Sequence, residues 1–215
     1  QYDFNVAFNI EDRIYLGATL GIYDVNYDRY TSYTEELNDD HGAENGGYTL
    51  DNYYGLKGTG VDLKLGVIVR PIEDSPFRLG LAIHTPTWYE LTENYNSTLS
   101  SDILAYEKAY DQTLSDFLDY KYLTYDYRMI TPWKFNVSAG TTLGGLVALG
   151  AEYEYADYGS SKLEDMDGYE LGDQATVESF LKGVHTFRVG MEARIAPQFS
   201  VRAGYNYTSA AFTDD

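Results

Sequence analysis

The sequence predicts an all-β protein, an antiparallel up-and-down transmembrane β-barrel of about eight strands with short helices in its long outer loops. The first observation is a period of two in the candidate strands, with apolar residues on one face and Gly, Asn, Ser or charged residues on the other. The second is an alternation of short and long connections. The third is the abundance of tyrosine, 23 residues in 215. A membrane barrel needs two-faced strands because lipid contacts one side and a polar lumen the other.

The alternation is clearest in residues 1–10, where Asp3, Asn5 and Asn9 separate apolar residues. We expect the apolar sets of this and three further segments to face lipid. These sets are Tyr2, Phe4, Val6, Phe8 and Ile10; Val61, Leu63, Leu65, Val67 and Val69; Phe187, Val189, Met191, Ala193 and Ile195; and Phe199, Val201, Ala203, Tyr205 and Tyr207. Tyrosines at the ends of apolar faces are expected at the membrane–water boundary, where an amphipathic ring is favoured. They are Tyr23, Tyr27, Tyr153, Tyr155, Tyr205 and Tyr207.

Turn residues divide the chain into these strands in order. Short connections are predicted at residues 11–12, 71–76, 144–145 and 196–198. Long connections are predicted at residues 31–53, 92–122 and 157–183, all at the same end of the barrel. Outer-membrane barrels have this asymmetry between short periplasmic turns and long outer loops.

Two segments depart from the simple pattern of straight strands and irregular loops. The fifth strand, residues 125–143, contains Pro132 and is expected to bend there, because proline cannot donate to the strand ladder. The second long connection carries a helix signal, with Ser100 or Ser101 as the N-cap followed by apolar residues at near-helical spacing. These apolar residues are Ile103, Tyr106, Tyr110, Phe117 and Leu118. A second short helix is predicted at residues 174–181.

Composition limits the functional classes. The net charge is −19, and residues 31–53 contain acidic residues without any lysine or arginine. Many cations alternate with apolar residues inside the candidate strands, so the chain has no basic footprint for nucleic acid. There is no cysteine and no run of about twenty apolar residues. We expect one barrel domain over residues 1–215. Because the first strand runs toward a short turn and the last runs away from one, we expect both termini at the long-loop end, as in an internal piece of a larger barrel.

Several motifs resemble the outer-membrane long-chain fatty-acid and hydrocarbon transporter family (FadL/TodX type), in versions common in Bacteroidetes-like members. They lie at residues 58–66, 70–71, 78–80, 84–87, 131–136, 151–163 and 202–207. The resemblance implies a fourteen-stranded barrel with an N-terminal hatch, of which this chain would supply the fourth to eleventh strands. It also implies a bacterial outer-membrane location and uptake of a hydrophobic small molecule without catalysis or a cofactor. By this resemblance, the connections 31–53 and 92–122 would build the outer groove that first captures the ligand.

The candidate ligand-binding residues follow from the pattern and the resemblance together. Ile103, Tyr106, Tyr110 and Phe117 form the apolar stripe of the predicted loop helix, which would contact either the ligand or the barrel rim. Arg78 and Arg188 alternate with apolar residues and would meet a carboxylate head group in the lumen. The competing interpretation of such lumen charges, including Arg188, Glu192, Arg202, Asp62 and Lys64, is that they form ion pairs with one another.

Parts of the same sequence pattern also fit other functional classes. A soluble lipocalin-like barrel also has eight alternating strands, but its apolar face points inward. A general porin or structural outer-membrane protein would have the same two-faced barrel strands but would not bind a hydrophobic ligand. A hydrolase using His84 and Arg78, or His185 and Arg188, lacks a nucleophile motif. The acidic run at residues 164–168 lacks the first carboxylate of an EF-hand, because Leu163 holds that position.

Overall fold

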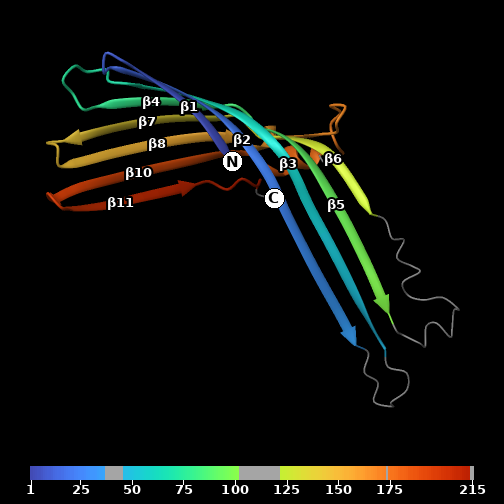
Figure 1. The fold of residues 1–215 in the computed structure, drawn as a ribbon. Coiled ribbons are helices and arrows are strands. Elements are labelled where there is room, and N and C mark those ends of the chain that lie inside the picture. The colour runs from blue at the N-terminus through green and yellow to red at the C-terminus, as the bar shows by residue number, and fades with distance from the viewer. Residues whose placement is uncertain (37–45, 102–121, 173, 214–215) are drawn as a thin grey trace. The chain divides into compact units, whose positions relative to one another are not determined.

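A computed structural model describes residues 1–36, 46–101, 122–172 and 174–213 of the chain. These residues form eleven strands and two short helical segments (Figure 1). The strands are β1 (Tyr2–Ile10), β2 (Ile14–Glu36), β3 (Gly47–Val69), β4 (Arg78–His84), β5 (Trp88–Ser101), β6 (Leu123–Ile130), β7 (Lys134–Leu143), β8 (Val147–Asp157), β9 (Lys162–Glu164), β10 (Gly183–Ala196) and β11 (Phe199–Thr208). The helical segments are the 3₁₀ turn η2 (Tyr158–Ser160) and α2 (Gln174–Phe180).

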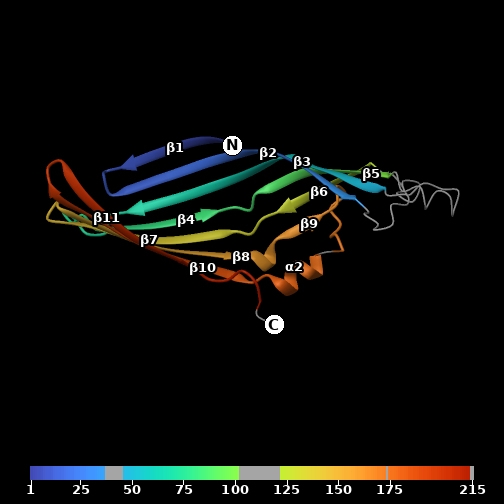
Figure 2. The same ribbon diagram turned by 90° about the horizontal axis from the view of Figure 1, so that it is seen from below.

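All strands belong to one sheet with the order β11-β10-β8-β7-β4-β3-β5-β6-β9, and β2 lies between β1 and β3. Every pairing with a resolved register is antiparallel. Among the described strands, β1 pairs only with β2 and β11 only with β10. The predicted all-β antiparallel class is confirmed, because each hairpin neighbour in the sequence is also a neighbour in the sheet (Figure 2).

Two of the predicted strands are each divided in two by a proline. The bend predicted at Pro132 is confirmed, since β6 ends at Ile130 and β7 begins at Lys134. A second break at Pro86, between β4 and β5, was not predicted. Threonines join the two breaks: the Thr87 backbone N–H donates to Thr131 Oγ1 (2.8 Å), and the Thr131 N–H donates to the Thr87 carbonyl (3.1 Å). The backbone groups freed by the prolines are therefore satisfied locally.

Two of the three long connections are shorter than predicted. β2 extends to Glu36 and β3 begins at Gly47, so much of the segment 31–53 is strand. β5 continues through Ser101. An N-cap residue itself has extended backbone, and the helix predicted to follow Ser100 or Ser101 lies outside the described residues, so it stays a prediction. Tyrosines, serines and threonines of these segments favour extended backbone while giving neither face an apolar pattern. The predicted helix stripe of Ile103, Tyr106, Tyr110 and Phe117 lies outside the described residues.

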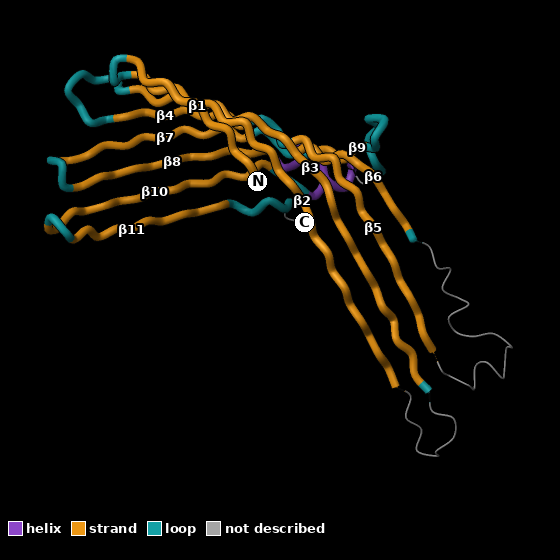
Figure 3. Tube along the Cα trace, viewed as in Figure 1, coloured by secondary structure: helices purple, strands orange, loops and turns teal. Residues whose placement is uncertain are grey.

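The connection between β8 and β10 contains the helical segments of the described residues (Figure 3). The helix predicted at residues 174–181 is confirmed as α2, which ends at Phe180. The short strand β9 pairs with β6 at Arg128–Ile130 and was not predicted. No helix in the described part of the chain is long and apolar enough to cross a membrane.

The chain divides into two compact units, each made of segments that are distant in the sequence. Unit 1 comprises Gln1–Tyr23, Thr59–Glu90 and Arg128–Asp215, and unit 2 comprises Asp24–Gly58 and Leu91–Tyr127. A single barrel domain over residues 1–215 stays a prediction.

In unit 1 the strand register keeps the two faces of the sheet separate. Phe4 lies opposite Leu20, and Val189 lies opposite Ala151 on one side and Tyr205 on the other. The intervening positions pair small or polar residues, such as Asn5 with Thr19. We call these the apolar face and the polar face. A register slip of one residue would exchange them, so the pattern itself fixes the register.

Candidate functional site

The polar face of unit 1 carries a buried carboxylate, Asp62 on β3, which is 5% exposed. Its Oδ2 accepts hydrogen bonds from the Tyr23 hydroxyl (2.9 Å) and the Thr87 hydroxyl (3.4 Å). Lys64 Nζ lies 3.6 Å from the same oxygen and donates to the Tyr23 hydroxyl oxygen (3.0 Å). The predicted place of Tyr23 at the end of an apolar face is therefore wrong, because its hydroxyl lies beside Asp62 and Lys64 on the polar face.

Two glycines make room for this cluster. A Cβ on Gly21 would lie 2.3 Å from Asp62 Oδ1, and a Cβ on Gly60 would lie 2.4 Å from the Tyr89 ring. Side chains at these two positions would collide with the carboxylate and the ring. Glycine thus permits Asp62 and Tyr89 to fold flat over the polar face, and Asp62 is buried by its own neighbours.

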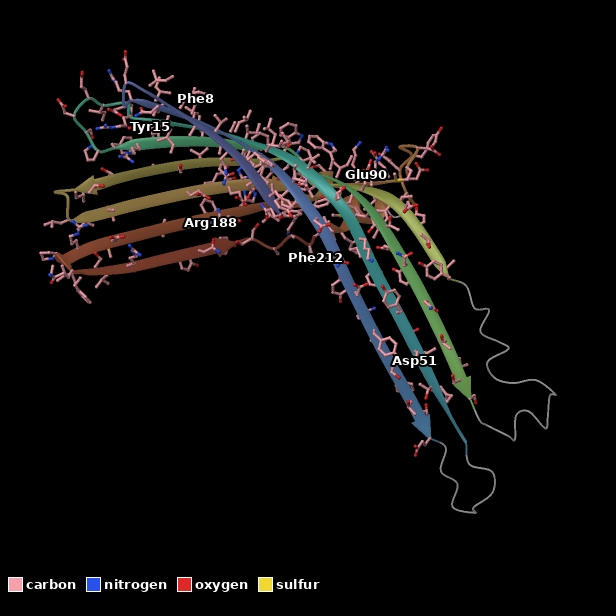
Figure 4. The ribbon with its side chains drawn as sticks, viewed as in Figure 1. Phe8, Tyr15, Asp51, Glu90, Arg188 and Phe212 are labelled. Carbon is pink, nitrogen blue, oxygen red and sulfur yellow. The ribbon has the colours of Figure 1, made fainter. Side chains whose placement is uncertain are left out.

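A second cluster lies on β7, β8 and β10 and contains Arg188, which is labelled in Figure 4. Arg188 forms ion pairs with Glu152 and, at 3.5 Å, with Glu154. Asn136 donates its amide to Glu152 (3.3 Å) and Glu154 (3.0 Å). On β10 and β11, the Arg202 guanidinium donates to Glu192 (2.7 Å). The interpretation that these charged residues form ion pairs is confirmed for Arg188, for Arg202 with Glu192, and for Lys64 with Asp62. Such pairs hold neighbouring strands in register more than they add net stability.

The predicted ligand-binding residues are not brought together among the described residues. Arg188 lies on the polar face and is engaged by two glutamates. Arg78 begins β4, lies opposite Gly140, and makes no ion pair within the described ranges. Ile103, Tyr106, Tyr110 and Phe117 fall outside those ranges, so their role stays a prediction.

A row of basic residues crosses the polar face and was missed by the sequence analysis. Lys64 on β3 lies directly opposite His84 on β4, and His84 lies opposite Lys134 on β7. Lys64 and His84 are 20 positions apart in the chain, and His84 and Lys134 are 50 positions apart. Only the strand order and register bring them to one level, so the sequence pattern alone contained no signal for the row.

The apolar face ends in an aromatic cluster beside the connection from β8 to β10. The Tyr153 hydroxyl lies 2.7 Å from His185 Nδ1, and the Tyr153 ring lies 4.9 Å from that of Phe187, measured between ring centroids. Tyr155 and Tyr207 extend the cluster. Rings with one apolar and one polar edge are typical of a membrane–water boundary, as predicted for Tyr153, Tyr155 and Tyr207.

Unit 2 is dominated by hydrogen bonds from tyrosine to carboxylates. Tyr30 donates to Asp51 (2.6 Å) and Tyr48 donates to Glu35 (2.6 Å). The hydrogen bond to Glu35 raises the pKa of Tyr48 to about 12. The bond from Tyr30 lowers the pKa of Asp51, because it stabilises the ionised carboxylate. With few cations in this unit, phenols take the place of ion-pair partners for its acidic residues.

Glu93 on β5 is the centre of the largest such group. It accepts hydrogen bonds from the hydroxyls of Tyr127 (2.8 Å), Tyr54 (3.1 Å) and Tyr95 (3.1 Å). Burial, together with the neighbouring carboxylate, raises the pKa of Tyr54 to about 12 and also raises the pKa of Tyr127. The Arg29 guanidinium lies 5.8 Å from the centre of the Tyr54 ring. The carboxylate is thus fully occupied by this unit's own side chains, which favours a structural role.

No protein-family model matches the chain, and no curated protein matches it. Among solved structures, the crystal structure of a FadL homologue from Pseudomonas aeruginosa is similar, with a TM-score of 0.49 and 13% sequence identity. The similarity covers 99% of this chain and 60% of that chain, so this chain spans less than two thirds of the FadL homologue's length.

Proposed function

We propose that the chain forms part of an outer-membrane β-barrel that binds and takes up hydrophobic small molecules, such as long-chain fatty acids. The proposal places the apolar face of unit 1 against outer-membrane lipid and the polar face toward the lumen. It involves binding and passage of the cargo, without a catalytic step or a cofactor.

The distribution of exposure over the two faces carries the proposal. On the apolar face, Leu81 is 57% exposed and Val137 is 50% exposed, whereas Asp62 on the polar face is 5% exposed. Burying a carboxylate while exposing a row of large apolar side chains is the reverse of a water-soluble fold. Lipid would cover that face and recover the free energy of apolar burial, about 25 cal/mol per Å².

This distribution also favours the membrane barrel over the soluble lipocalin-like alternative. A lipocalin-like barrel would crowd its apolar side chains together around the ligand and leave the polar ones in water. In the central strands β3, β4 and β7 the polar-face residues are the more covered. The lengths of three strands are also those of membrane-spanning strands. β7, β8 and β11 have 10, 11 and 10 residues, and a tilted membrane strand needs roughly 9–11.

The hydrophobic cargo is supported by the motifs that resemble the fatty-acid and hydrocarbon transporter family. In this proposal the segments 31–53 and 92–122, which include the ends of β2, β3 and β5, form the first landing site, where Ile103, Tyr106, Tyr110 and Phe117 contact the cargo. Arg78, and Arg188 with its glutamate partners, line the route on the lumen side. Removing one well-buried aromatic side chain from such a site costs roughly 1.5 to 3 kcal/mol, or about ten- to hundredfold in affinity.

The test is uptake of a labelled long-chain fatty acid by Gram-negative cells that lack their own transporter and express the full-length parent protein. A triple variant, Tyr106→Ser, Tyr110→Ser and Phe117→Ser, should reduce uptake at low fatty-acid concentration while leaving the folded barrel intact on a heat-modifiability gel. A small hydrophilic sugar serves as the control cargo. Entry of the sugar without entry of the fatty acid would instead identify a general porin.

A further inference from the structure

A hollow with a volume of about 540 Å³ lies on the apolar face of unit 1, over β7, β8, β10 and β11. Its volume is within the range of about 300 to 1,000 Å³ that small-molecule sites occupy. Alanines lower the surface there, since Ala139 lies opposite Ala151, and Ala203 lies opposite Met191. Larger apolar side chains of the same face form its sides, and they are Leu149, Val189 and Met191. An acyl chain lying in the hollow would contact more protein than one on a flat part of the wall.

The apolar face becomes polar in steps from this hollow toward the connection between β8 and β10. Along β8, its successive residues are Leu149, Ala151, Tyr153, Tyr155 and Asp157. Along β10, they are Met191, Val189, Phe187 and His185. The eight residues from Leu149 to Asp157 span about 26 Å along the strand, enough for one leaflet of a bilayer about 40 to 45 Å thick. The order of hydrocarbon, aromatic rings, imidazole and carboxylate therefore has the length and the polarity of one membrane lipid.

Two hydrogen-bond donors at this end are left over by the protein. The Tyr153 hydroxyl lies 2.7 Å from His185 Nδ1, and when it donates to Nδ1 the other ring nitrogen, Nε2, carries the proton. Among the described residues, neither Nε2 of His185 nor the Tyr155 hydroxyl has a hydrogen-bond partner. The two rings lie 5.1 Å apart between centroids, so both donors can reach one acceptor. Gly183 leaves room for the Tyr155 hydroxyl, because a Cβ there would lie 2.6 Å from it.

The carboxylate of Asp157 stands beyond these donors, at the exposed end of β8. It caps no helical turn with its side chain and forms no ion pair within the described ranges. The neighbouring charges of β8 and β10, Glu154 and Arg188, lie on the polar face and pair with each other. Two donors followed by a carboxylate fit a head group that carries a phosphate next to its acyl chains and a cation at its tip.

We infer that this part of the wall binds one phospholipid with a zwitterionic head group of the phosphatidylethanolamine class. One acyl chain lies in the hollow over Ala139 and Ala151, the phosphate accepts from His185 and Tyr155, and the ammonium meets Asp157. The inference rests on the proposed function, which places the apolar face in lipid. It adds a resident lipid on the outside of the wall, separate from the cargo route on the polar face.

The test is native mass spectrometry of the full-length parent protein in neutral detergent, titrated with lipids that share two myristoyl chains. Phosphatidylethanolamine should bind most tightly. Phosphatidylglycerol, which has the phosphate but no ammonium, should bind less tightly, and dimyristoylglycerol, which has neither, should bind least. Equal binding of all three would overturn the head-group assignment. Lipid A is a further titrant, and its preferred binding would overturn the zwitterionic class in favour of a phosphorylated glycolipid.

One pair of variants tests the phosphate contact. Tyr155→Phe should weaken binding of both phospholipids about ten- to hundredfold, the loss of one hydrogen bond to a charged group, and leave dimyristoylglycerol unchanged. Tyr2→Phe is the matched control, because Tyr2 is also an exposed tyrosine of the apolar face whose hydroxyl makes no hydrogen bond among the described residues. Equal effects of the two substitutions would overturn the phosphate site.

A second pair tests the ammonium contact. Asp157→Asn should lower the affinity for phosphatidylethanolamine to that for phosphatidylglycerol, because the amide has no charge to attract the ammonium. Asp74→Asn, at an exposed position in the connection between β3 and β4, should keep the preference. A preference that survives in the Asp157 variant would overturn this contact.

A third pair tests the position of the acyl chain. Ala151→Phe should fill the hollow and weaken all three lipids. Ala193→Phe, at an alanine of the apolar face of β10 that does not line the hollow, should leave them unchanged. Heat-modifiable gel mobility checks that each variant is folded. Normal binding by a folded Ala151 variant would place the lipid elsewhere and overturn the site.

The outcomes also separate this inference from the proposed function. If cells expressing the parent take up fatty acid while the isolated protein shows no lipid preference, the inference fails and the function stands. If the protein selects phosphatidylethanolamine but cells take up no fatty acid, the uptake function fails and the lipid site stands.

Discussion

Adjacent residues of one strand face opposite environments, and Val189 and Gly190 of β10 make a matched pair. Val189 is 52% exposed on the apolar face, and Gly190 lies opposite Gly150 and Gly204 on the polar face. Arginine at Val189 should cost about 2 to 4 kcal/mol in a bilayer, because a charge in mid-membrane lipid is poorly solvated. Arginine at Gly190 should cost less, since it can reach water or Glu152.

Heat-modifiable gel mobility of both variants after folding into lipid measures this difference. The expected result is a large loss of the folded band for Val189→Arg and a smaller one for Gly190→Arg. Equal losses at both positions would contradict the assignment of the faces.

The tyrosine–carboxylate bonds of unit 2 should show in an alkaline titration. The folded-state pKa of Tyr48, about 12, is above its ordinary value of 10.0, so the bond to Glu35 stabilises the fold fully below pH 10 and is lost as pH rises toward 12. Tyrosinate absorbance should contain a late step near pH 12 that Tyr48→Phe reduces. Tyr169→Phe, at an exposed tyrosine without a hydroxyl hydrogen bond in the described residues, should leave that late step unchanged. A Tyr48→Phe titration that keeps the late step unchanged would argue against the bond.

At the scale of elements, the paired breaks at Pro86 and Pro132 depend on threonine side chains. Thr131→Val removes the acceptor of the Thr87 N–H and should cost about 1 to 3 kcal/mol, because that donor becomes unsatisfied within the protein. Thr141→Val on β7 is the control, since Thr141 lies on the apolar face opposite Leu149 and its hydroxyl makes no hydrogen bond among the described residues. Urea midpoints of the folded protein in detergent compare the two. A Thr141 variant as unstable as the Thr131 variant would exclude this role for the threonine contact.

The strands most visible in the sequence are those whose alternation has an energetic cause. In β1, β10 and β11 one face needs apolar side chains and the other does not, so period two locates them and their turns. The outer parts of β2, β3 and β5 were missed because their faces carry tyrosines and polar residues alike. The break at Pro86 was missed because His84 and Trp88 on either side continue an acceptable strand pattern. Alternation gives the face of a residue but not its partner, which is why Arg188 was assigned correctly to the polar face while the Lys64, His84 and Lys134 row was not found.

At the scale of the whole molecule, the proposal requires the long connections at one membrane surface and the short turns at the other. Single cysteines at Ser97 and Asp167, expressed in the parent protein, should react with a membrane-impermeant maleimide on intact cells. Cysteines at Asp74 and Gln198, in the short turns, should react only after the outer membrane is opened. The reverse pattern of labelling would overturn the orientation.

The central claim is that lipid covers the apolar face of unit 1, and fluorescence quenching by lipids with brominated acyl chains tests it most directly. Trp88 and Trp133 are replaced by Phe, and one tryptophan is then introduced at either Leu149 or Gly150, neighbours on β8. Leu149 lies opposite Met191 on the apolar face, and Gly150 lies opposite Gly190 on the polar face with no heavy atom near its missing Cβ. The account predicts strong quenching of the tryptophan at position 149 by brominated lipid and little at position 150, with aqueous acrylamide giving the opposite order. Equal quenching at both positions, or stronger lipid quenching at position 150, would contradict it.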